Sequence, residues 1–324
     1  MSLSSGAASI HAPSHGTVTL LILGAGWTYQ FLQPLLEREL CITYAATTST
    51  GHDNTLEFRF DPESDDLEPF QRLPLAEYVL ITFPLKGKGP SKKLVGMYEA
   101  THARSLSREA GYGVEKTTQT KWIQLGSTGV YTAADWVDCS TPIDSSNERG
   151  IAEDELIALN GCVLNLAGLY GAQRQPGNWI PRVAKTQEQL GDKGALHLVH
   201  GVDVGRAIIA VVKEDQRSSS ASEPDASLVF GRRWIISDCV SYDWWQIVWD
   251  FNGESEEAVF SEEEDAENAA EADTKRKYRG WVMDLMDKKG VRGLPRPPEL
   301  LGRKLDGREF WTSLRLRPER ALKR

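Results

Sequence analysis

Short apolar runs alternate with amphipathic stretches along the first two thirds of the chain. The apolar runs are rich in β-branched residues and predict buried strands at 17–23, 41–48, 56–61, 78–84, 121–126 and 162–167. Between them, apolar residues recur every three to four positions and predict helices at 27–40, 93–110, 154–159 and 204–212. Strands that alternate with helices in this way predict an α/β fold, a Rossmann-type doubly wound parallel sheet.

The last third of the chain has a different pattern. A strand is expected at 228–236, and a helix that carries three tryptophans at 242–251. We therefore expect a smaller C-terminal α/β lobe. The predicted division is a disordered lead over 1–16, a nucleotide-binding domain over 17–213, and a substrate-side lobe over 214–324 with an acidic insertion at about 252–274. Asp203 is expected to cap the helix at 204–212.

Charge is spread unevenly along the chain. The net charge is −9, and 254–273 hold ten acids with no Lys or Arg, whereas 274–324 hold sixteen Lys or Arg against six acids. We interpret the acidic segment as a solvated insertion beside a basic surface that it partly neutralises. Because no RNA- or DNA-binding motif accompanies the basic residues, a nucleic-acid partner is not favoured.

The composition also bears on the compartment. No apolar run approaches the roughly 18 residues of a membrane-spanning helix, and 1–16 lack the features of a signal peptide. The four cysteines are far apart and form no Cys-x-x-Cys pair. We expect free thiols in a reducing compartment, a cytoplasmic location, no disulfide framework and no metal site.

Two glycines follow the first predicted strand directly. Gly24 and Gly26 precede a helix that begins near Trp27, as in a turn that brings a dinucleotide pyrophosphate to a helix N-terminus. The third glycine of the Gly-x-Gly-x-x-Gly pattern is replaced by Tyr29. This stretch alone fits a cofactor-binding turn, formed by Gly24, Gly26 and Trp27, and a plain tight turn equally well.

Two other strand ends border the same predicted crevice. Thr47 and Thr48 end the second strand, where an acid would select NAD; hydroxyl groups can donate to a 2′-phosphate, so NADP is slightly favoured over NAD. The fourth strand ends at Phe83 and Pro84 and is followed by Lys86, which could meet a phosphate or belong to a solvated loop.

Four stretches, in this order, resemble the extended short-chain dehydrogenase/reductase superfamily, and more narrowly its atypical NAD-dependent epimerase/dehydratase-like members. They are Leu-Gly-Ala-Gly-Trp at 23–27, Leu-Gly-Ser-Thr-Gly-Val-Tyr at 125–131, Leu-Ala-Gly-Leu-Tyr-Gly at 166–171 and Leu-Val-His-Gly-Val-Asp-Val at 198–204. The resemblance implies NAD(P) as the cofactor, a small-molecule substrate and a possible homodimer. It covers 17–213 well and the C-terminal lobe loosely.

Active members of this superfamily use a Ser or Thr after the fifth strand and a Tyr-x-x-x-Lys pair in the next helix. Ser127 matches the first position, but Ser145 and Arg149 stand where the tyrosine and lysine belong. Arg149 could hold a ribose or an anion, although its permanent charge prevents it from accepting a proton. Tyr131 is either a displaced acid/base or a packing residue. The candidate catalytic residues are therefore Ser127, Tyr131 and Arg149.

The loop after the sixth strand carries the candidate substrate residues. Arg174 and Arg182 could clamp an anion and Trp179 could stack on it, or all three could be surface residues. Two functions stay open. One is an NAD(P)-dependent oxidoreductase or epimerase with a non-standard acid/base, acting on a small or anionic carbonyl or alcohol. The other is a catalytically inactive nucleotide-binding sensor, or a regulatory or interaction protein.

Overall fold

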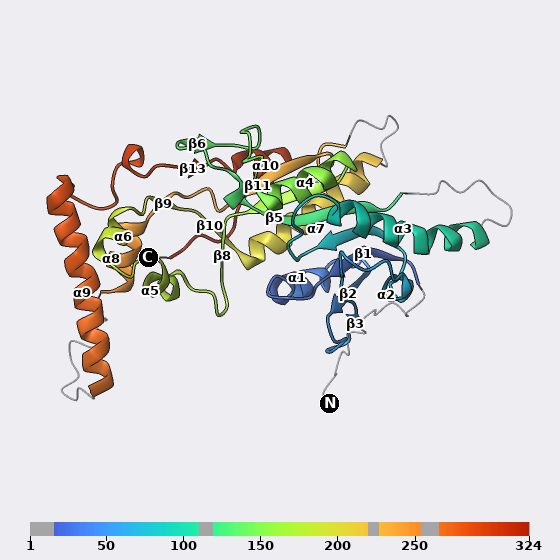
Figure 1. Cartoon of the computed structure of the whole chain (residues 1–324), viewed down its shortest axis with the longest axis horizontal. Helices are drawn as coiled ribbons and strands as arrows, with labels where there is room; N and C mark the ends of the chain where they lie inside the picture. Colours follow the sequence, from blue (N-terminus) through green and yellow to red (C-terminus); the bar gives the residue numbers. More distant parts are fainter. Residues whose placement is uncertain (1–15, 110–118, 220–226, 254–265, 324) are drawn as a thin grey trace, which may run out of the picture.

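The computed structural model describes residues 16–109, 119–219, 227–253 and 266–323. Its centre is one seven-stranded sheet with the order β11-β7-β5-β4-β1-β2-β3, and every neighbouring pair is parallel (Figure 1). The strands are β1 (Val18–Leu23), β2 (Tyr44–Thr48), β3 (Leu56–Glu57), β4 (Ala76–Ile81), β5 (Lys121–Ser127), β7 (Cys162–Leu166) and β11 (Arg232–Ile236). The doubly wound parallel sheet predicted from the sequence is confirmed.

The strand order determines where a ligand would be expected. From β1 the chain runs outward through β2 and β3, then returns to β4 and runs in the other direction through β5, β7 and β11. The direction therefore reverses between β1 and β4. In open α/β sheets, ligands bind beyond the carboxyl ends of the strands at this switch point.

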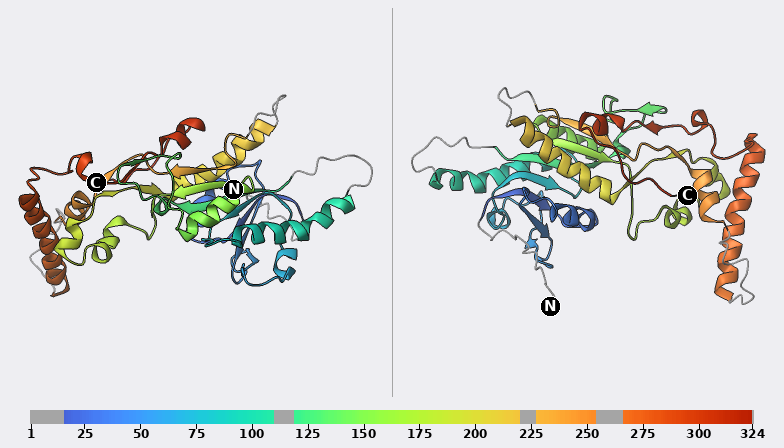
Figure 2. Two further views of the ribbon diagram at one scale, coloured as in Figure 1. Left: turned by 45° about the horizontal axis from the view of Figure 1, so that its top comes forward. Right: turned by 180° about the vertical axis from the view of Figure 1, so that it is seen from behind.

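The sheet lies between two layers of helices (Figure 2). Side chains of a strand alternate between its faces, so Leu20 and Ile22 of β1 lie in one apolar cluster, whereas Leu21 and Leu23 lie in another. The first cluster includes residues of α1 (Tyr29–Leu36), α7 (Gly201–Ser219) and α10 (Arg308–Ser313); the second includes residues of α2 (Glu68–Gln71), α3 (Pro90–Glu109) and α4 (Glu148–Ala158).

A separate apolar cluster forms the lobe that lies away from the sheet in Figures 1 and 2. Trp244 and Trp245 are buried in it, so they pack the lobe interior. Its helices are α5 (Ile180–Val183), α6 (Gln187–Gly191), α8 (Trp244–Phe251) and α9 (Ala266–Lys289). Short strand pairs join the lobe and its connections: β8 (Gly168–Tyr170) with β10 (Leu198–His200), β9 (Ala195–Leu196) with β12 (Tyr242–Asp243), and β6 (Trp136–Val137) with β13 (Lys304–Leu305).

Two features of the predicted C-terminal part differ in the structure. The strand expected in the lobe at 228–236 is β11, which pairs with β7 and extends the central sheet, with Trp234 fully buried. The prediction that Asp203 caps a helix is wrong, because α7 begins at Gly201 and Asp203 lies within its first turn. There its carboxylate accepts hydrogen bonds from the backbone N–H groups of Glu319 and Arg320, each at 2.9 Å.

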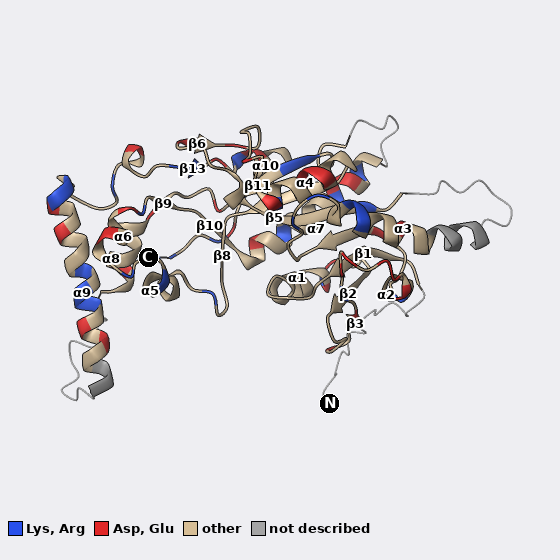
Figure 3. Ribbon diagram, in the orientation of Figure 1, with Lys and Arg blue, Asp and Glu red and all other residues tan. Residues whose placement is uncertain are grey.

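The charge prediction can be followed only in part. The N-terminal lead over 1–15 and the insertion over 254–265 lie outside the described residues, and from Ala266 the acidic segment belongs to α9. Short blocks of basic and of acidic residues follow one another along α9 (Figure 3). Lys275 lies 2.7 Å from Glu271, and Lys304 pairs with Asp135 at 2.8 Å, so part of the basic C-terminal charge is paired with carboxylates.

Candidate functional site

The turn after β1 is fixed by two threonines from neighbouring strands. The Gly24 N–H donates to the Thr47 hydroxyl at 3.0 Å, and the Thr82 hydroxyl donates to the Gly24 carbonyl at 2.6 Å. Gly24 has φ +97°, and a Cβ there would lie 2.6 Å from the Thr82 hydroxyl oxygen. Only glycine fits this position without strain.

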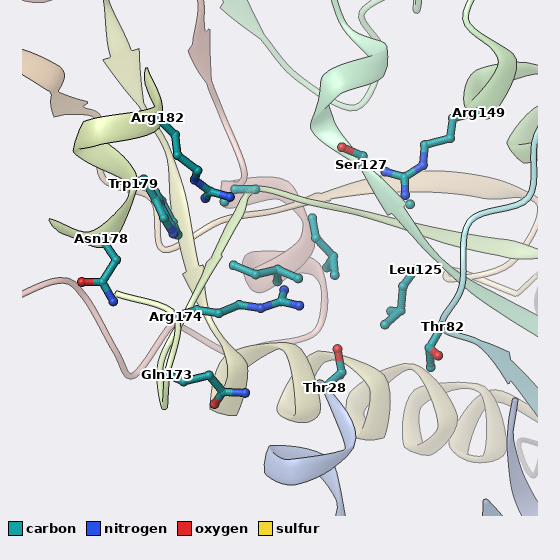
Figure 4. Close-up of a pocket in the computed structure, with 15 residues that line it drawn as sticks. Thr28, Thr82, Leu125, Ser127, Arg149, Gln173, Arg174, Asn178, Trp179 and Arg182 are labelled. Carbon is teal, nitrogen blue, oxygen red and sulfur yellow. The ribbon is translucent and has the colours of Figure 1, made fainter. Parts of the chain in front are cut away.

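Gly26 differs from Gly24. It has no positive φ, and a Cβ added to it would meet no described atom within 4 Å. The space above Gly26 is open, and two residues later Thr28, at the start of α1, lines the cavity that is drawn in Figure 4. Thr28 makes no capping hydrogen bond through its side chain. Backbone N–H groups at a helix N-terminus favour a bound phosphate, and an open glycine leaves room for it to approach.

The other predicted cofactor residues differ in burial and in their hydrogen-bond partners. Thr47 is 1% exposed and its hydroxyl is used by Gly24, whereas Thr48 bonds Thr55 at 2.7 Å and accepts from the Gly51 N–H. These hydroxyls support the turn and the loop after β2. Of the residues that follow β4, Phe83 stacks on Phe60, while Pro84 and Lys86 are exposed. It is Thr82 that faces the cavity described next, and the sequence analysis did not select it.

A cavity of about 820 Å³ opens beyond the carboxyl ends of β1, β4, β5 and β7 (Figure 4). Its lining comes from these strand ends, from Thr28 before α1, from Arg149 of α4 and from the segment 168–182. The lining residues are Thr28, Thr82, Leu125, Gly126, Ser127, Arg149, Leu166, Ala167, Gly168, Leu169, Gln173, Arg174, Asn178, Trp179 and Arg182. The cavity thus lies at the switch point of the sheet and has the size of a small-molecule site.

Three arginines from separate segments face this cavity. Arg149 comes from the first turn of α4, which Asn147 caps, while Arg174 and Arg182 come from the opposite wall (Figure 4). No Asp or Glu belongs to the described lining, and none of these arginines has a salt bridge to a carboxylate in the described part of the chain. The cavity therefore has a net positive charge.

Arg174 also joins the two sides of the cavity mouth. Its guanidinium lies 4.5 Å from the centre of the Trp27 indole ring, and Trp27 packs edge-to-face on Phe31. The Trp27 ring N–H is buried and has no hydrogen-bond partner among the described residues. The predicted cofactor turn and substrate loop are therefore in direct contact.

Ser127 is held from behind by a buried pair of side chains. Asn165 donates to the Glu153 carboxylate at 2.8 Å and to the Ser127 carbonyl at 3.3 Å, and Glu153 accepts from the Ser127 N–H at 3.4 Å. Burial raises the pKa of Glu153, and the Asn165 hydrogen bond opposes the shift. A Cβ on Gly126 would lie 2.4 Å from the Asn165 amide, so glycine makes room for the pair.

The Ser127 hydroxyl itself accepts from the Gly129 N–H at 3.1 Å and lines the cavity near Arg149 (Figure 4). Tyr131 does not join it. Tyr131 is 1% exposed, its hydroxyl has no partner among the described residues, and burial raises its pKa. A packing role fits this position, and an acid or base that touches a ligand does not.

No tyrosine, histidine, lysine or carboxylate belongs to the described lining of the cavity. The sequence already indicated the loss of the Tyr-Lys pair, and no residue from elsewhere in the described chain replaces it. The described residues also contain no group of three or more His, Cys, Asp or Glu that could hold a metal ion. Of the helices that the structure describes, none has the length and apolarity to cross a membrane.

Comparisons with known proteins identify the fold. No family model matches the sequence, and no curated protein matches it either. Among solved structures, a functionally unknown conserved protein from Silicibacter pomeroyi is similar, with a TM-score of 0.53 and 16% identity over 94% of both chains. The UDP-glucuronic acid 4-epimerase from Bacillus cereus, in complex with NAD, has a TM-score of 0.52 and 14% identity over 94% of both chains. The chain has an epimerase-type fold.

This epimerase-type fold is the one that the four sequence motifs imply, and the likeness extends through the C-terminal lobe. The motifs matched the sheet and its turns, whereas the lobe showed only a loose resemblance. At 14–16% identity the likeness defines the architecture, and the chemistry of the site must be argued from this chain's own residues.

Proposed function

We propose that this protein binds NAD or NADP at the turn formed by Gly24, Gly26 and Trp27, and binds an anionic carbonyl or alcohol compound in the arginine-lined cavity. The observation that carries the proposal is the cavity itself: it lies at the switch point of the sheet and contains three arginines and no carboxylate among its described lining. The NAD-bound epimerase of the same fold, whose name denotes an anionic sugar nucleotide, supports both parts.

The residues present fit a dinucleotide. The open space over Gly26 admits a pyrophosphate close to the backbone, and the unpartnered Trp27 N–H and the Thr28 hydroxyl can donate to it. The bound cofactor would supply hydride transfer at its nicotinamide. Arg149, Arg174 and Arg182 would hold the substrate anion, and the Ser127 hydroxyl would donate a hydrogen bond to the reacting oxygen.

Hydride transfer to or from a carbonyl or alcohol also requires a proton to be gained or lost at the reacting oxygen. With no acid or base in the described lining, a proton on the reacting oxygen would be exchanged with water rather than with a side chain. The same observation favours a second candidate function, a ligand-binding sensor without turnover. In the proposed domain division, the nucleotide-binding part would include β11 and α10, which lie after 213, and the substrate-side lobe would include α5 and α6, which lie before it. This division and assembly as a homodimer belong to the first candidate.

The first experiment titrates the purified protein with NADPH and NADH and follows nucleotide fluorescence. The proposal requires at least one Kd below about 1 mM, and weaker binding of both would remove it. The second experiment measures turnover on a panel of anionic carbonyl compounds, with Ser127→Ala as the site variant. Cofactor binding without turnover on any compound would favour the sensor.

Variants of the arginines test the anion site. Arg149→Met and Arg182→Met each remove charged hydrogen bonds worth about 1.5–3 kcal/mol. We therefore expect the affinity for the anionic carbonyl compounds of the panel to fall roughly ten- to hundredfold. Arg276→Met is a matched control, because that arginine is exposed on α9 and pairs with Asp273. A loss of affinity in all three variants alike would indicate a nonspecific charge effect.

A further inference from the structure

A second cavity, of about 470 Å³, lies in the C-terminal lobe and shares no described lining residue with the first. Its walls are the loop 191–195, the end of α9 and the segment 296–303. Four basic residues line it, Lys193, Lys289, Arg296 and Arg303, against one acid, Asp192.

Most of this positive charge is not neutralised by the protein. Arg296 is compensated, because its guanidinium lies 2.6 Å from the buried carboxylate of Asp243. Across the described residues, Lys193, Lys289 and Arg303 have no salt bridge to a carboxylate. Asp192 can offset one of these three charges, so the cavity keeps a net positive charge.

The walls are held in place by the protein's own contacts. The Ala195 N–H donates to the Leu301 carbonyl at 2.8 Å, and Arg296 donates to the Lys193 carbonyl at 2.7 Å. A Cβ on Gly194 would lie 2.1 Å from the Leu301 carbonyl oxygen, so glycine permits the two segments to approach this closely. A ligand would enter a site whose backbone is already ordered, which lowers the entropic cost of binding.

Arg303 connects this cavity with the segment after β5. Its guanidinium donates to the backbone carbonyls of Thr128 and Tyr131, which uses two of its five N–H groups. Burial lowers the pKa of Arg303, since desolvation disfavours its charge. An anion in the cavity would stabilise that charge.

We propose that this second cavity binds a phosphate-bearing small molecule. Uncompensated lysine and arginine side chains recognise phosphate oxygens. The volume lies within the range of small-molecule sites and leaves room for more than a phosphate group. This inference does not depend on NAD(P) binding, because the two cavities have separate linings.

The test uses isothermal titration calorimetry with inorganic pyrophosphate, without any dinucleotide. Lys193→Met and Lys289→Met each remove a charged donor from the cavity, and we expect each to weaken binding roughly tenfold. Lys288→Met is the matched control, because it removes the same charge from the neighbouring residue, which does not line the cavity. Arg182→Met reports any pyrophosphate that binds in the first cavity.

Weaker binding in the Lys193 and Lys289 variants, with Lys288→Met and Arg182→Met within twofold of the wild type, supports the second site. Equal losses in the Lys288, Lys193 and Lys289 variants overturn it, as does a loss confined to Arg182→Met. A wild-type Kd weaker than about 1 mM also overturns it. Thermal unfolding of each variant confirms that the compared proteins are folded.

Discussion

The guanidinium of Arg174 lies over the indole ring of Trp27, 4.5 Å from its centre. Trp27 belongs to the turn after β1 and Arg174 to the loop after β8, so this single contact joins the proposed cofactor and substrate segments. The two residues are 147 positions apart in the sequence, and nothing in the local pattern around either one predicts that they meet.

We predict that Arg174→Met loosens the turn after β1. A cation–π contact contributes about 0.5–2 kcal/mol, so amide hydrogen exchange at residues 25–28 should accelerate roughly two- to thirtyfold. Arg279→Met is the control, because Arg279 stacks on Trp249 in the lobe at 3.9 Å. Unchanged exchange at 25–28 in the Arg174 variant would show that the contact does not hold the turn.

The two glycines of the turn should respond differently to substitution. Gly24→Ala places a Cβ at φ +97° and 2.6 Å from the Thr82 hydroxyl, so we expect a loss of about 1–3 kcal/mol in the free energy of unfolding. Gly26→Ala meets no described atom within 4 Å and should unfold like the wild type.

Gly26→Ala should nevertheless weaken dinucleotide binding, because its methyl group occupies the space that we assign to the pyrophosphate. Urea unfolding and NADPH titration of both variants check the pair of predictions. Wild-type NADPH affinity in Gly26→Ala would contradict the placement of the cofactor over this turn.

His197 should make stability depend on pH. Its Nε2 accepts from the Leu305 N–H at 3.1 Å, and burial lowers the pKa of His197 from 6.5 to about 4. A lowered pKa means that the unfolded chain binds the proton more readily, so the contribution is present above pH 6.5 and is lost as the pH falls toward 4.

The loss should reach about 3 kcal/mol at the acid end of this window. In His197→Gln, we expect a lower free energy of unfolding at pH 7 and a flatter pH dependence between 6.5 and 4. Urea unfolding at several pH values measures both. His52→Gln is the control, because His52 is exposed, and an identical pH profile in the wild type and His197→Gln would refute the assignment.

Asp203 should be essential for the C-terminal segment. Its carboxylate, which is fully buried, accepts two backbone N–H groups and pairs with Arg206 at 2.7 Å. Asp203→Asn removes the charge and places an amide against at least one donor, so the free energy of unfolding should fall by about 2–4 kcal/mol.

Limited proteolysis should then cut the Asp203→Asn variant within 314–323 at protease concentrations that spare the wild type. Glu214→Gln serves as the control, because Glu214 pairs with the exposed Arg217 toward the other end of α7. Equal resistance of Asp203→Asn and Glu214→Gln to the protease would show that the contacts of Asp203 contribute little to the stability of the C-terminal segment.

The sheet and the cofactor turn could be predicted because their signals are local. Apolar runs mark the strands, and Gly24 is required by the backbone of its own turn. The missing third glycine at Tyr29 shows the limit of this approach. Helices α1 and α7 pack closely because of a glycine in α7 instead: a Cβ on Gly205 would lie 3.3 Å from the Leu32 Cα.

The site was predicted only in part, since several of its features depend on contacts across the fold. Ser127, Arg149, Arg174, Trp179 and Arg182 were selected from motifs, and the structure places all five around one cavity. The support of Ser127 by Glu153 and Asn165 was not foreseen, because it depends on how β5, α4 and β7 pack against one another rather than on a local pattern. Tyr131 was selected for its place in a motif, but its side chain points into the core.

The hydrogen bonds between Asp203 and the C-terminal segment also impose an order on folding during synthesis. By the time the ribosome has synthesised Ile236, every strand of the central sheet exists, but the Asp203 carboxylate still lacks the backbone donors of Glu319 and Arg320. In a chain synthesised only to this point, the Asp203 carboxylate can pair with Arg206, but the two backbone donors of the C-terminal segment are missing. This contact between α7 and the C-terminal segment can therefore form only after residues 319 and 320 have left the exit tunnel.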